Sequence, residues 1–230
     1  MIESLLPASV VAVESFTDDT ADSLFPEEAA LVANAVEPRR REFATTRRCA
    51  REALAKLGAP PAPLLRDPKG APQWPSGFIG SITHCAGYRA AAVTRADALT
   101  ALGIDAEPNL PLPDEGVLDL VTLPEERRHL TSLASHHPEV QWDRLLFSAK
   151  ETVYKVWYPL THRWLDFHDA TLTLHPATST FTARILVPSP FPTLTGTWLC
   201  GEGLLVTAAT ITSSHSTSTH TPTPGPVTSS

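Results

Sequence analysis

Two carboxylates lie close together where an apolar segment ends, in Gly103-Ile104-Asp105-Ala106-Glu107-Pro108. If this segment is a strand, its period of two directs Asp105 and Glu107 to the same face. Two carboxylates that project together repel each other unless a cation lies between them, and their oxygen atoms suit Mg²⁺. The pair is therefore a candidate metal site, with acids solvated at a strand end as the alternative.

A third acid, Glu151, lies further along the chain in Phe147-Ser148-Ala149-Lys150-Glu151-Thr152-Val153-Tyr154-Lys155. The pattern predicts a helix, in which Glu151 and Lys155 are four positions apart and share a face. Glu151 would add a third acid to the two at 103–108. The alternative is an exposed ion pair that adds about 0.2–0.5 kcal/mol to helix stability and has no catalytic role.

Six arginines gather between residues 39 and 51, in a chain whose formal net charge is −7. They are Arg39, Arg40, Arg41, Arg47, Arg48 and Arg51. Because general nucleic-acid-binding proteins usually carry an excess of Lys and Arg, the negative net charge argues against that class. A local basic patch on an acidic protein indicates a small, strongly anionic ligand, or else a solvated helix face.

The pattern of apolar residues predicts the elements that must position these groups. The predicted helical regions are 27–57, broken at Pro38, then 124–134, and 142–157, ended by Pro159. The predicted strands are 78–84, 88–94, 101–106, 170–174, 181–187, 197–200 and 204–211. Helix followed by strands, twice over, indicates an α+β fold of two similar halves, 1–102 and 103–212. The tail 213–230 is almost entirely Ser, Thr, Pro and His, and we expect it to be disordered.

The composition of the 230 residues, with 42% hydrophobic and 19% charged, is typical of a soluble globular protein. No run approaches the roughly 20 apolar residues of a membrane-spanning helix, and the first residues lack the features of a signal peptide. The three cysteines, Cys49, Cys85 and Cys200, are too few and too far apart for a disulfide framework. We therefore expect a cytoplasmic protein.

The strand end at 103–108 together with the helix at 147–155 resembles the signature of the Sfp-type 4′-phosphopantetheinyl transferases. The segments 43–51 and 80–88 resemble the branch of that family that includes enterobactin synthetase component D. The resemblance covers nearly everything except the tail. It implies two α+β halves related by a pseudo-twofold axis, an active site between them, and a monomer.

The resemblance also implies an activity: Mg²⁺-dependent transfer of the phosphopantetheine arm of coenzyme A to a serine of a carrier protein. Adenosine 3′,5′-bisphosphate would be released, and the carrier would serve fatty-acid, polyketide or nonribosomal-peptide synthesis. The implied metal ligands are Asp105, Glu107 and Glu151, with Mn²⁺ as an alternative ion because it too accepts oxygen ligands. Glu151 would also be the base that activates the serine, directly or through a metal-bound water.

Coenzyme A carries a 3′-phosphate and a pyrophosphate, which suit planar guanidinium groups and ammonium groups. The coenzyme contacts that the resemblance implies are Arg39, Arg47, Lys69, Thr83, His84, Lys150 and Lys155. Among these, Lys155 would contact the pyrophosphate and assist catalysis, and Lys150 would do likewise or be solvated.

Two other functions share these residue types. A different Mg²⁺ enzyme, such as a phosphodiesterase or nucleotidyltransferase, would also use three acids and nearby cations. A module without catalytic activity would use the basic helix to bind an anion or a nucleic acid, and its affinity would fall steeply with salt.

Overall fold

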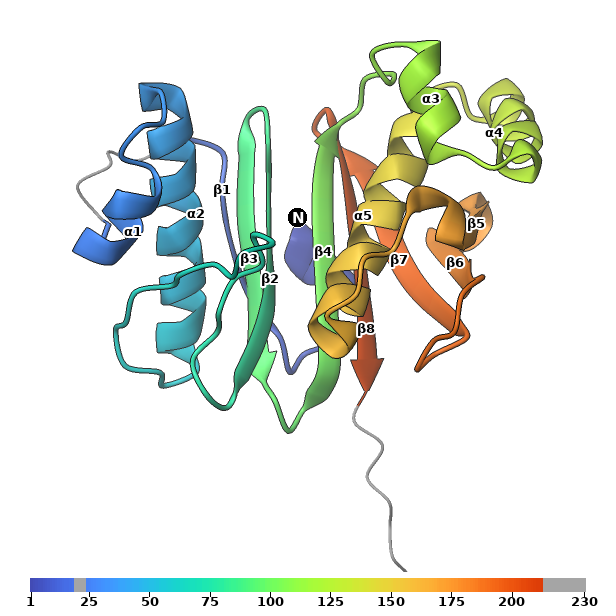
Figure 1. Ribbon diagram of the computed structural model, residues 1–230. Helices are drawn as coiled ribbons and strands as arrows, with labels where there is room; N and C mark the ends of the chain where they lie inside the picture. The colour runs from blue at the N-terminus through green and yellow to red at the C-terminus, as the bar shows by residue number, and fades with distance from the viewer. Residues whose placement is uncertain (19–23, 213–230) are drawn as a thin grey trace, which may run out of the picture.

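The structure is a computed structural model, and it describes residues 1–18 and 24–212. Two antiparallel sheets stand side by side, and each packs against one long helix of 20 residues (Figure 1). The predicted α+β fold of two similar halves is confirmed. The tail expected to be disordered, 213–230, lies outside the described residues.

The first half carries a three-stranded sheet in the order β1-β3-β2. Its elements are η1 (Ile2–Leu5), β1 (Val11–Ser15), α1 (Pro26–Leu31), α2 (Glu37–Lys56), β2 (Phe78–Cys85) and β3 (Tyr88–Arg95). The helix α2 packs on β3 and β1 through small buried side chains, including Ala50 and Ala53. The helices α1 and α2 are separated at residues 32–36, just before the break predicted at Pro38. Pro38 itself lies in the first turn of α2, where a missing N–H costs no helical bond.

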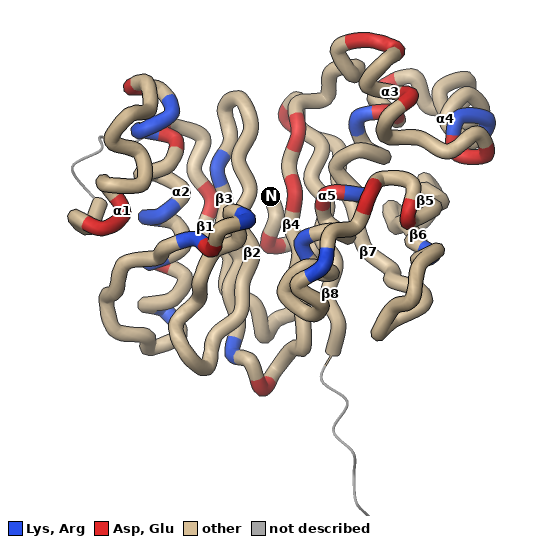
Figure 2. Tube along the Cα trace, viewed as in Figure 1, with Lys and Arg blue, Asp and Glu red and all other residues tan. Residues whose placement is uncertain are grey.

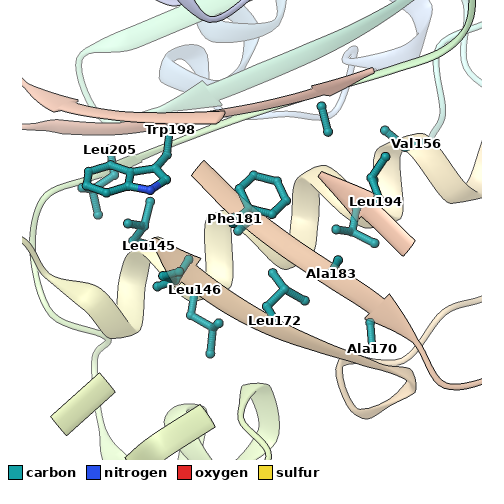
Figure 3. Packing of buried hydrophobic residues seen from close by; sticks show 14 of the residues in the cluster. Leu145, Leu146, Val156, Ala170, Leu172, Phe181, Ala183, Leu194, Trp198 and Leu205 are labelled. Carbon is teal, nitrogen blue, oxygen red and sulfur yellow. The ribbon is translucent and has the colours of Figure 1, made fainter. Parts of the chain in front are cut away.

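The second half carries a five-stranded sheet in the order β4-β8-β7-β6-β5. Its elements are β4 (Leu99–Pro108), α3 (Glu115–Val121), α4 (Pro124–His136), α5 (Trp142–Thr161), η3 (Phe167–Asp169), β5 (Ala170–His175), η4 (Pro176–Thr178), β6 (Thr180–Ile185), β7 (Thr193–Gly201) and β8 (Leu204–Thr212). Figure 3 shows Leu145 and Leu146 of α5 packed with Phe181 and Trp198 of the sheet. This apolar cluster fixes α5, which carries Glu151 and Lys155, on the sheet.

Three features of the fold differ from the sequence-based prediction. The prediction did not include strand β1, which has five residues, or helix α3, which has seven and so spans only about two turns. Pro159 does not end α5: the helix continues to Thr161, since His162 N–H donates to the carbonyl of Tyr158 at 2.8 Å and closes the last turn. The expected division at 102/103 falls inside β4, which begins at Leu99, so the sheets separate at the turn before that strand.

The two halves meet where β2 lies beside β4, joined by side chains and not by a continuous backbone ladder. Ser81 Oγ accepts from Ile104 N–H at 3.1 Å, and Thr83 Oγ1 accepts from Ala106 N–H at 2.9 Å. On the other side of β4, a Cβ built on Gly103 would lie 2.5 Å from the carbonyl oxygen of Thr152 in α5. The glycine of the Gly-Ile-Asp motif thus lets α5 approach β4 closely.

A third core cluster fills the space between the halves. It joins Ile2 of η1 and Tyr88 of β3 to Ile104 of β4 and Val206 of β8, all fully buried.

None of the helices in the described ranges is long and apolar enough to cross a membrane.

Candidate active site

A cavity of about 650 Å³ opens between the two halves, bounded by α2, the loop after it, β2, β4 and α5. It is lined by six of the predicted coenzyme contacts, Arg39, Arg47, Lys69, Thr83, His84 and Lys155. Two of the predicted acids, Asp105 and Glu151, line it as well. The structure therefore brings together groups from both halves that are up to 116 positions apart in the sequence, from Arg39 to Lys155.

Asp105 is the most buried acid of the cavity, with 5% of its surface exposed. Its Oδ1 accepts from Lys155 Nζ at 2.7 Å and from Thr83 Oγ1 at 3.2 Å. Its Oδ2 is buried and has no hydrogen-bond partner among the described residues. A carboxylate oxygen in this state strongly favours a cation beside it, because burial of an unpaired charge is costly.

The charge of Asp105 is felt by both other predicted ligands. Burial and the charge of Asp105 together raise the pKa of Glu107 to about 7, against the opposing charge of Arg144, which lies 3.1 Å from Glu107 Oε2. Burial also raises the pKa of Glu151, where Lys155 opposes the shift and Asp105 adds to it. Figure 2 shows acidic positions along β4 and both acidic and basic positions along α5.

The three acids are near one another without forming a closed ligand set. Within residues 1–18 and 24–212, no group of three or more His, Cys, Asp or Glu side chains is gathered as metal ligands. The donor chemistry nevertheless fits a hard cation: the unpaired oxygen of Asp105 and two carboxylates with raised pKa values would all be stabilised by Mg²⁺. Asp105, Glu107 and Glu151 as metal ligands remain a prediction.

Lys155 contacts both β2 and β4 along the line where the two halves meet, which we call the seam. Besides Asp105, its Nζ donates to the carbonyl oxygens of Ile104 at 3.0 Å and Ile82 at 3.3 Å, which belong to β4 and β2. Its charge is therefore placed beside the buried carboxylate, at the wall of the cavity. Thr83, whose hydroxyl is already engaged by Asp105 and Ala106, acts at the same seam.

The cationic end of the cavity is built from α2 and the end of β2. Arg39 NH1 lies 2.9 Å from His84 Nε2, and Arg39 also pairs with Glu42. His84 Nδ1 lies 3.5 Å from Glu42 Oε1. Burial lowers the pKa of His84, and the charges of Arg39 and Lys155 lower it further against the opposing charge of Glu42. Arg39 and His84 share a single carboxylate, that of Glu42, so an anionic ligand would add negative charge where cationic groups predominate.

Arg47 lies deeper than the other arginines, with 5% of its surface exposed. Its Nε donates to the carbonyl of Leu64 at 2.8 Å, and its guanidinium lies 4.3 Å from the centre of the Phe43 ring. Burial lowers the pKa of Arg47 to about 10, with the charge of Glu28 opposing the shift. The guanidinium is thus fixed in orientation and only partly compensated, as a phosphate contact requires.

Lys69 reaches the cavity from a turn that Asp67 organises. Asp67 Oδ1 accepts from the backbone N–H groups of Lys69 at 2.8 Å and Ala71 at 2.9 Å, and Gly70 adopts a φ of 91°. That φ is one that glycine adopts without strain. The sequence Asp-Pro-Lys-Gly therefore builds a turn that presents an exposed lysine to the cavity.

Comparisons with known proteins identify the family of this chain. Residues 27–94 match the 4′-phosphopantetheinyl transferase N-terminal domain, and residues 101–203 match the 4′-phosphopantetheinyl transferase superfamily. The 4′-phosphopantetheinyl transferase Svp of Streptomyces mobaraensis is 56% identical over 220 residues, which cover 92% of this chain and 89% of that protein. The chain belongs to the 4′-phosphopantetheinyl transferase family.

Two further relatives differ in how much of the chain they cover. The 4′-phosphopantetheinyl transferase PptT of Mycobacterium tuberculosis is 47% identical over 224 residues, covering 90% of this chain and 96% of that protein. Enterobactin synthase component D of Salmonella typhi is 33% identical over 117 residues, covering 51% of this chain and 47% of that protein. The predicted family and enzyme class are confirmed. The comparisons support neither a phosphodiesterase or nucleotidyltransferase nor a binding module without catalytic activity.

The geometry of this 4′-phosphopantetheinyl transferase corrects one predicted contact. Lys150 is buried and does not line the cavity between the halves. Its Nζ donates to Glu126 Oε2 at 2.8 Å, to the carbonyl of Val121 at 2.8 Å and to that of Phe167 at 2.7 Å. On the helix α5 it points to the opposite side from Lys155, so it anchors α3 and α4 and has no geometric support as a coenzyme contact.

Sequence reasoning missed Glu42 and Arg144, two charged residues that pair with the predicted site residues Arg39 and Glu107. Glu42 was hidden in an arginine-rich run, although its spacing of three from Arg39 on a helix indicated a pair. Arg144 lies outside both motifs, and the sequence carried no signal that it would contact Glu107.

Proposed function

We propose that this transferase moves the 4′-phosphopantetheine arm of coenzyme A to a serine hydroxyl of a carrier protein in a Mg²⁺-dependent reaction, in the cavity between its two halves. The observation that carries the proposal is the buried carboxylate of Asp105, which faces Lys155 with one oxygen and has an unpaired second oxygen. Carriers of fatty-acid, polyketide or nonribosomal-peptide synthesis are the proposed partners.

Asp105, Glu107 and Glu151 would hold the Mg²⁺. When bound, the ion neutralises charge on the phosphoryl oxygens and on the departing adenosine 3′,5′-bisphosphate. The raised pKa values of Glu107 and Glu151 support this role, because burial and the nearby charge of Asp105 both disfavour their charged forms, which a bound cation would stabilise. The same oxygen ligands would also accept Mn²⁺.

The chain's own residues would bind and orient the coenzyme. Arg39, Arg47, Lys69 and His84 would contact its phosphates from the first half, and Lys155 would face the pyrophosphate from the second half. The permanent cations Arg39, Arg47, Lys69 and Lys155 supply the attraction to the polyanion. The fixed guanidinium of Arg47 supplies direction. With the phosphates held from both halves, the reacting phosphorus would lie near Asp105, where the two halves meet.

In the transfer, the serine oxygen forms a bond to the phosphorus that carries the pantetheine, and the bond from that phosphorus to the adenosine bisphosphate oxygen breaks. Glu151 would accept the serine proton, directly or through a water. Its raised pKa supports this role, since a carboxylate with a raised pKa is a stronger base near neutral pH.

The test is intact-mass spectrometry of apo carrier proteins from the three classes, incubated with the transferase, coenzyme A and Mg²⁺. The expected result is the gain of one phosphopantetheine, lost when EDTA replaces the metal. Asp105→Asn should reduce transfer by about 100-fold or more. Asp97→Asn, at an exposed turn, is the matched control and should transfer normally. Transfer at a normal rate by Asp105→Asn, or in EDTA, would refute the metal role.

A further inference from the structure

A hydrogen bond joins the two halves at the cavity wall and is not part of the machinery described above. Tyr158 of α5 donates its hydroxyl hydrogen to Asp67 Oδ2 at 2.7 Å. Tyr158 has 9% of its surface exposed, and both residues line the cavity. Asp67 lies in the loop that connects α2 to β2, so the bond links the second half to the loop of the first.

The two oxygens of Asp67 have different partners. Oδ1 accepts from Lys69 N–H and Ala71 N–H within the turn, while Oδ2 accepts from Tyr158 across the cavity. The hydrogen bond from Tyr158 lowers the pKa of Asp67, which keeps the carboxylate charged and the contact strong. The turn that carries Lys69 is thereby tied to α5 through a single carboxylate.

Tyr158 is itself fixed in direction by its neighbours on α5. Its ring lies 5.8 Å from that of Tyr154 and 5.9 Å from that of His162, centre to centre. The loop is also fixed to the first half, where the carbonyl of Leu64 accepts from Arg47 Nε at 2.8 Å. That contact holds the start of the loop on α2, whereas the bond from Tyr158 ties its later turn to α5 of the second half.

We propose that Tyr158 is a positioning residue: through Asp67 it holds the turn at 67–70, and with it Lys69, against the coenzyme cavity. The inference rests on the proposed function, in which Lys69 contacts a phosphate of coenzyme A. The attraction between an ammonium and a phosphate falls with distance, and ordering a loop costs conformational entropy on binding. A loop held in place before binding therefore binds the coenzyme more tightly, without affecting the chemical step.

The first test is Tyr158→Phe, which removes the hydroxyl and keeps the ring. The expected result is a rise of about fivefold in KM for coenzyme A, the size of the net contribution of one typical hydrogen bond, with kcat unchanged. In a Lys69→Ala background the same substitution should cause no further rise. A fall in kcat at unchanged KM, or additive effects with Lys69→Ala, would overturn the proposal.

A second measurement does not depend on activity. Hydrogen exchange of the backbone amides of Lys69 and Ala71 should become faster in Tyr158→Phe than in the wild type. The matched control is Tyr154→Phe, one turn earlier on α5, whose hydroxyl has no hydrogen-bond partner among the described residues; it should leave this exchange unchanged. Equal exchange in wild type and Tyr158→Phe would overturn the proposal.

The two proposals fail in different ways. If the wild-type protein transferred no phosphopantetheine to any carrier, the proposed function would fail, while the exchange of the loop amides would still decide whether Tyr158 holds the turn. If the wild type transferred normally and Tyr158→Phe matched it in both KM and exchange, only the role of Tyr158 would fail.

Discussion

Lys155 Nζ lies 2.7 Å from Asp105 Oδ1, while Oδ2 of the same carboxylate is buried without a partner in the described part of the chain. One lysine therefore compensates part of the charge at a point where Asp105 also raises the pKa values of Glu107 and Glu151. The buried carboxylates therefore destabilise one another in their charged forms, and this repulsion has measurable consequences.

The first consequence is that the contribution of Glu107 to the free energy of unfolding depends on pH. Its pKa is about 7 in the folded protein, above the ordinary value of 4.5, so the folded state binds more protons between these values. The contribution of Glu107 to stability is thus present below about pH 4.5 and lost as the pH rises through about 7. Glu107→Gln should raise the Tm of metal-free protein at pH 8 by about 2–4 °C, after discounting for solvent screening.

The measurement is thermal unfolding in EDTA at pH 8 and at pH 5. The gain of Glu107→Gln should largely disappear at pH 5, because the wild-type side chain is then mostly protonated. Gln keeps an oxygen that can accept from Arg144, which makes the substitution a fair match. An equal difference in Tm at both pH values would show that the effect has another cause.

The second consequence concerns His84, whose pKa is lowered by burial and by neighbouring cations in the free protein. A phosphate beside the imidazole would favour its charged form, so binding of coenzyme A should take up a proton near pH 7. Isothermal titration in two buffers of different ionisation enthalpy measures this uptake. His84→Gln should abolish its share of the uptake and weaken binding by about tenfold.

The variant also serves as the control, because the phosphates of coenzyme A can exchange protons by themselves. The prediction therefore concerns the difference between wild type and His84→Gln. If the two proteins took up the same number of protons, His84 would not be a phosphate contact.

The helices and most strands could be predicted from the sequence because long periodic segments such as 142–157 carry a strong signal. The short strand β1 and helix α3 carried little signal. Candidate site residues could be predicted where a motif holds ionisable side chains at a fixed spacing, as for Asp105, Glu107 and Glu151. Contacts between distant segments were not accessible: nothing near Lys150 indicated that its partner would be Glu126, and nothing near Asp67 indicated Tyr158.

Substitution in the buried pair of Lys150 and Glu126 should change stability and leave coenzyme binding unchanged, the reverse of what we expect for the coenzyme contacts. Both side chains are almost fully buried, and Glu126 also accepts from Leu123 N–H and Leu172 N–H. Lys150→Met removes the cation and leaves a buried carboxylate, which should cost about 3 kcal/mol or more of unfolding free energy. Urea unfolding measures the loss, and the KM for coenzyme A of the folded variant should stay unchanged.

Lys69→Met is the matched control, since the same substitution is made at an exposed lysine that lines the cavity. It should change the unfolding free energy by less than about 0.5 kcal/mol and raise the KM for coenzyme A. The reverse pattern, with a raised KM for Lys150→Met and none for Lys69→Met, would contradict the positions assigned to both lysines.

The last prediction tests how Gly103 couples the fold to the site. A Cβ at this position would lie 2.5 Å from the Thr152 carbonyl oxygen and 2.8 Å from Val156 Cγ2, so Gly103→Ala must push α5 away from β4. The displacement should destabilise the protein by about 1–3 kcal/mol. Because α5 carries Glu151 and Lys155, and β4 carries Asp105, kcat should fall as well, since small misplacements of catalytic groups are costly.

Gly201→Ala is the control in the same sheet, because a Cβ there would meet only Leu199 Cδ2, at the ordinary distance of 3.5 Å. It should leave the Tm and kcat close to those of the wild type. Chemical unfolding and carrier-protein transfer assays on the two variants give both readouts. If Gly103→Ala unfolded and turned over like Gly201→Ala, the close packing of α5 on β4 would not be what places Lys155 beside Asp105.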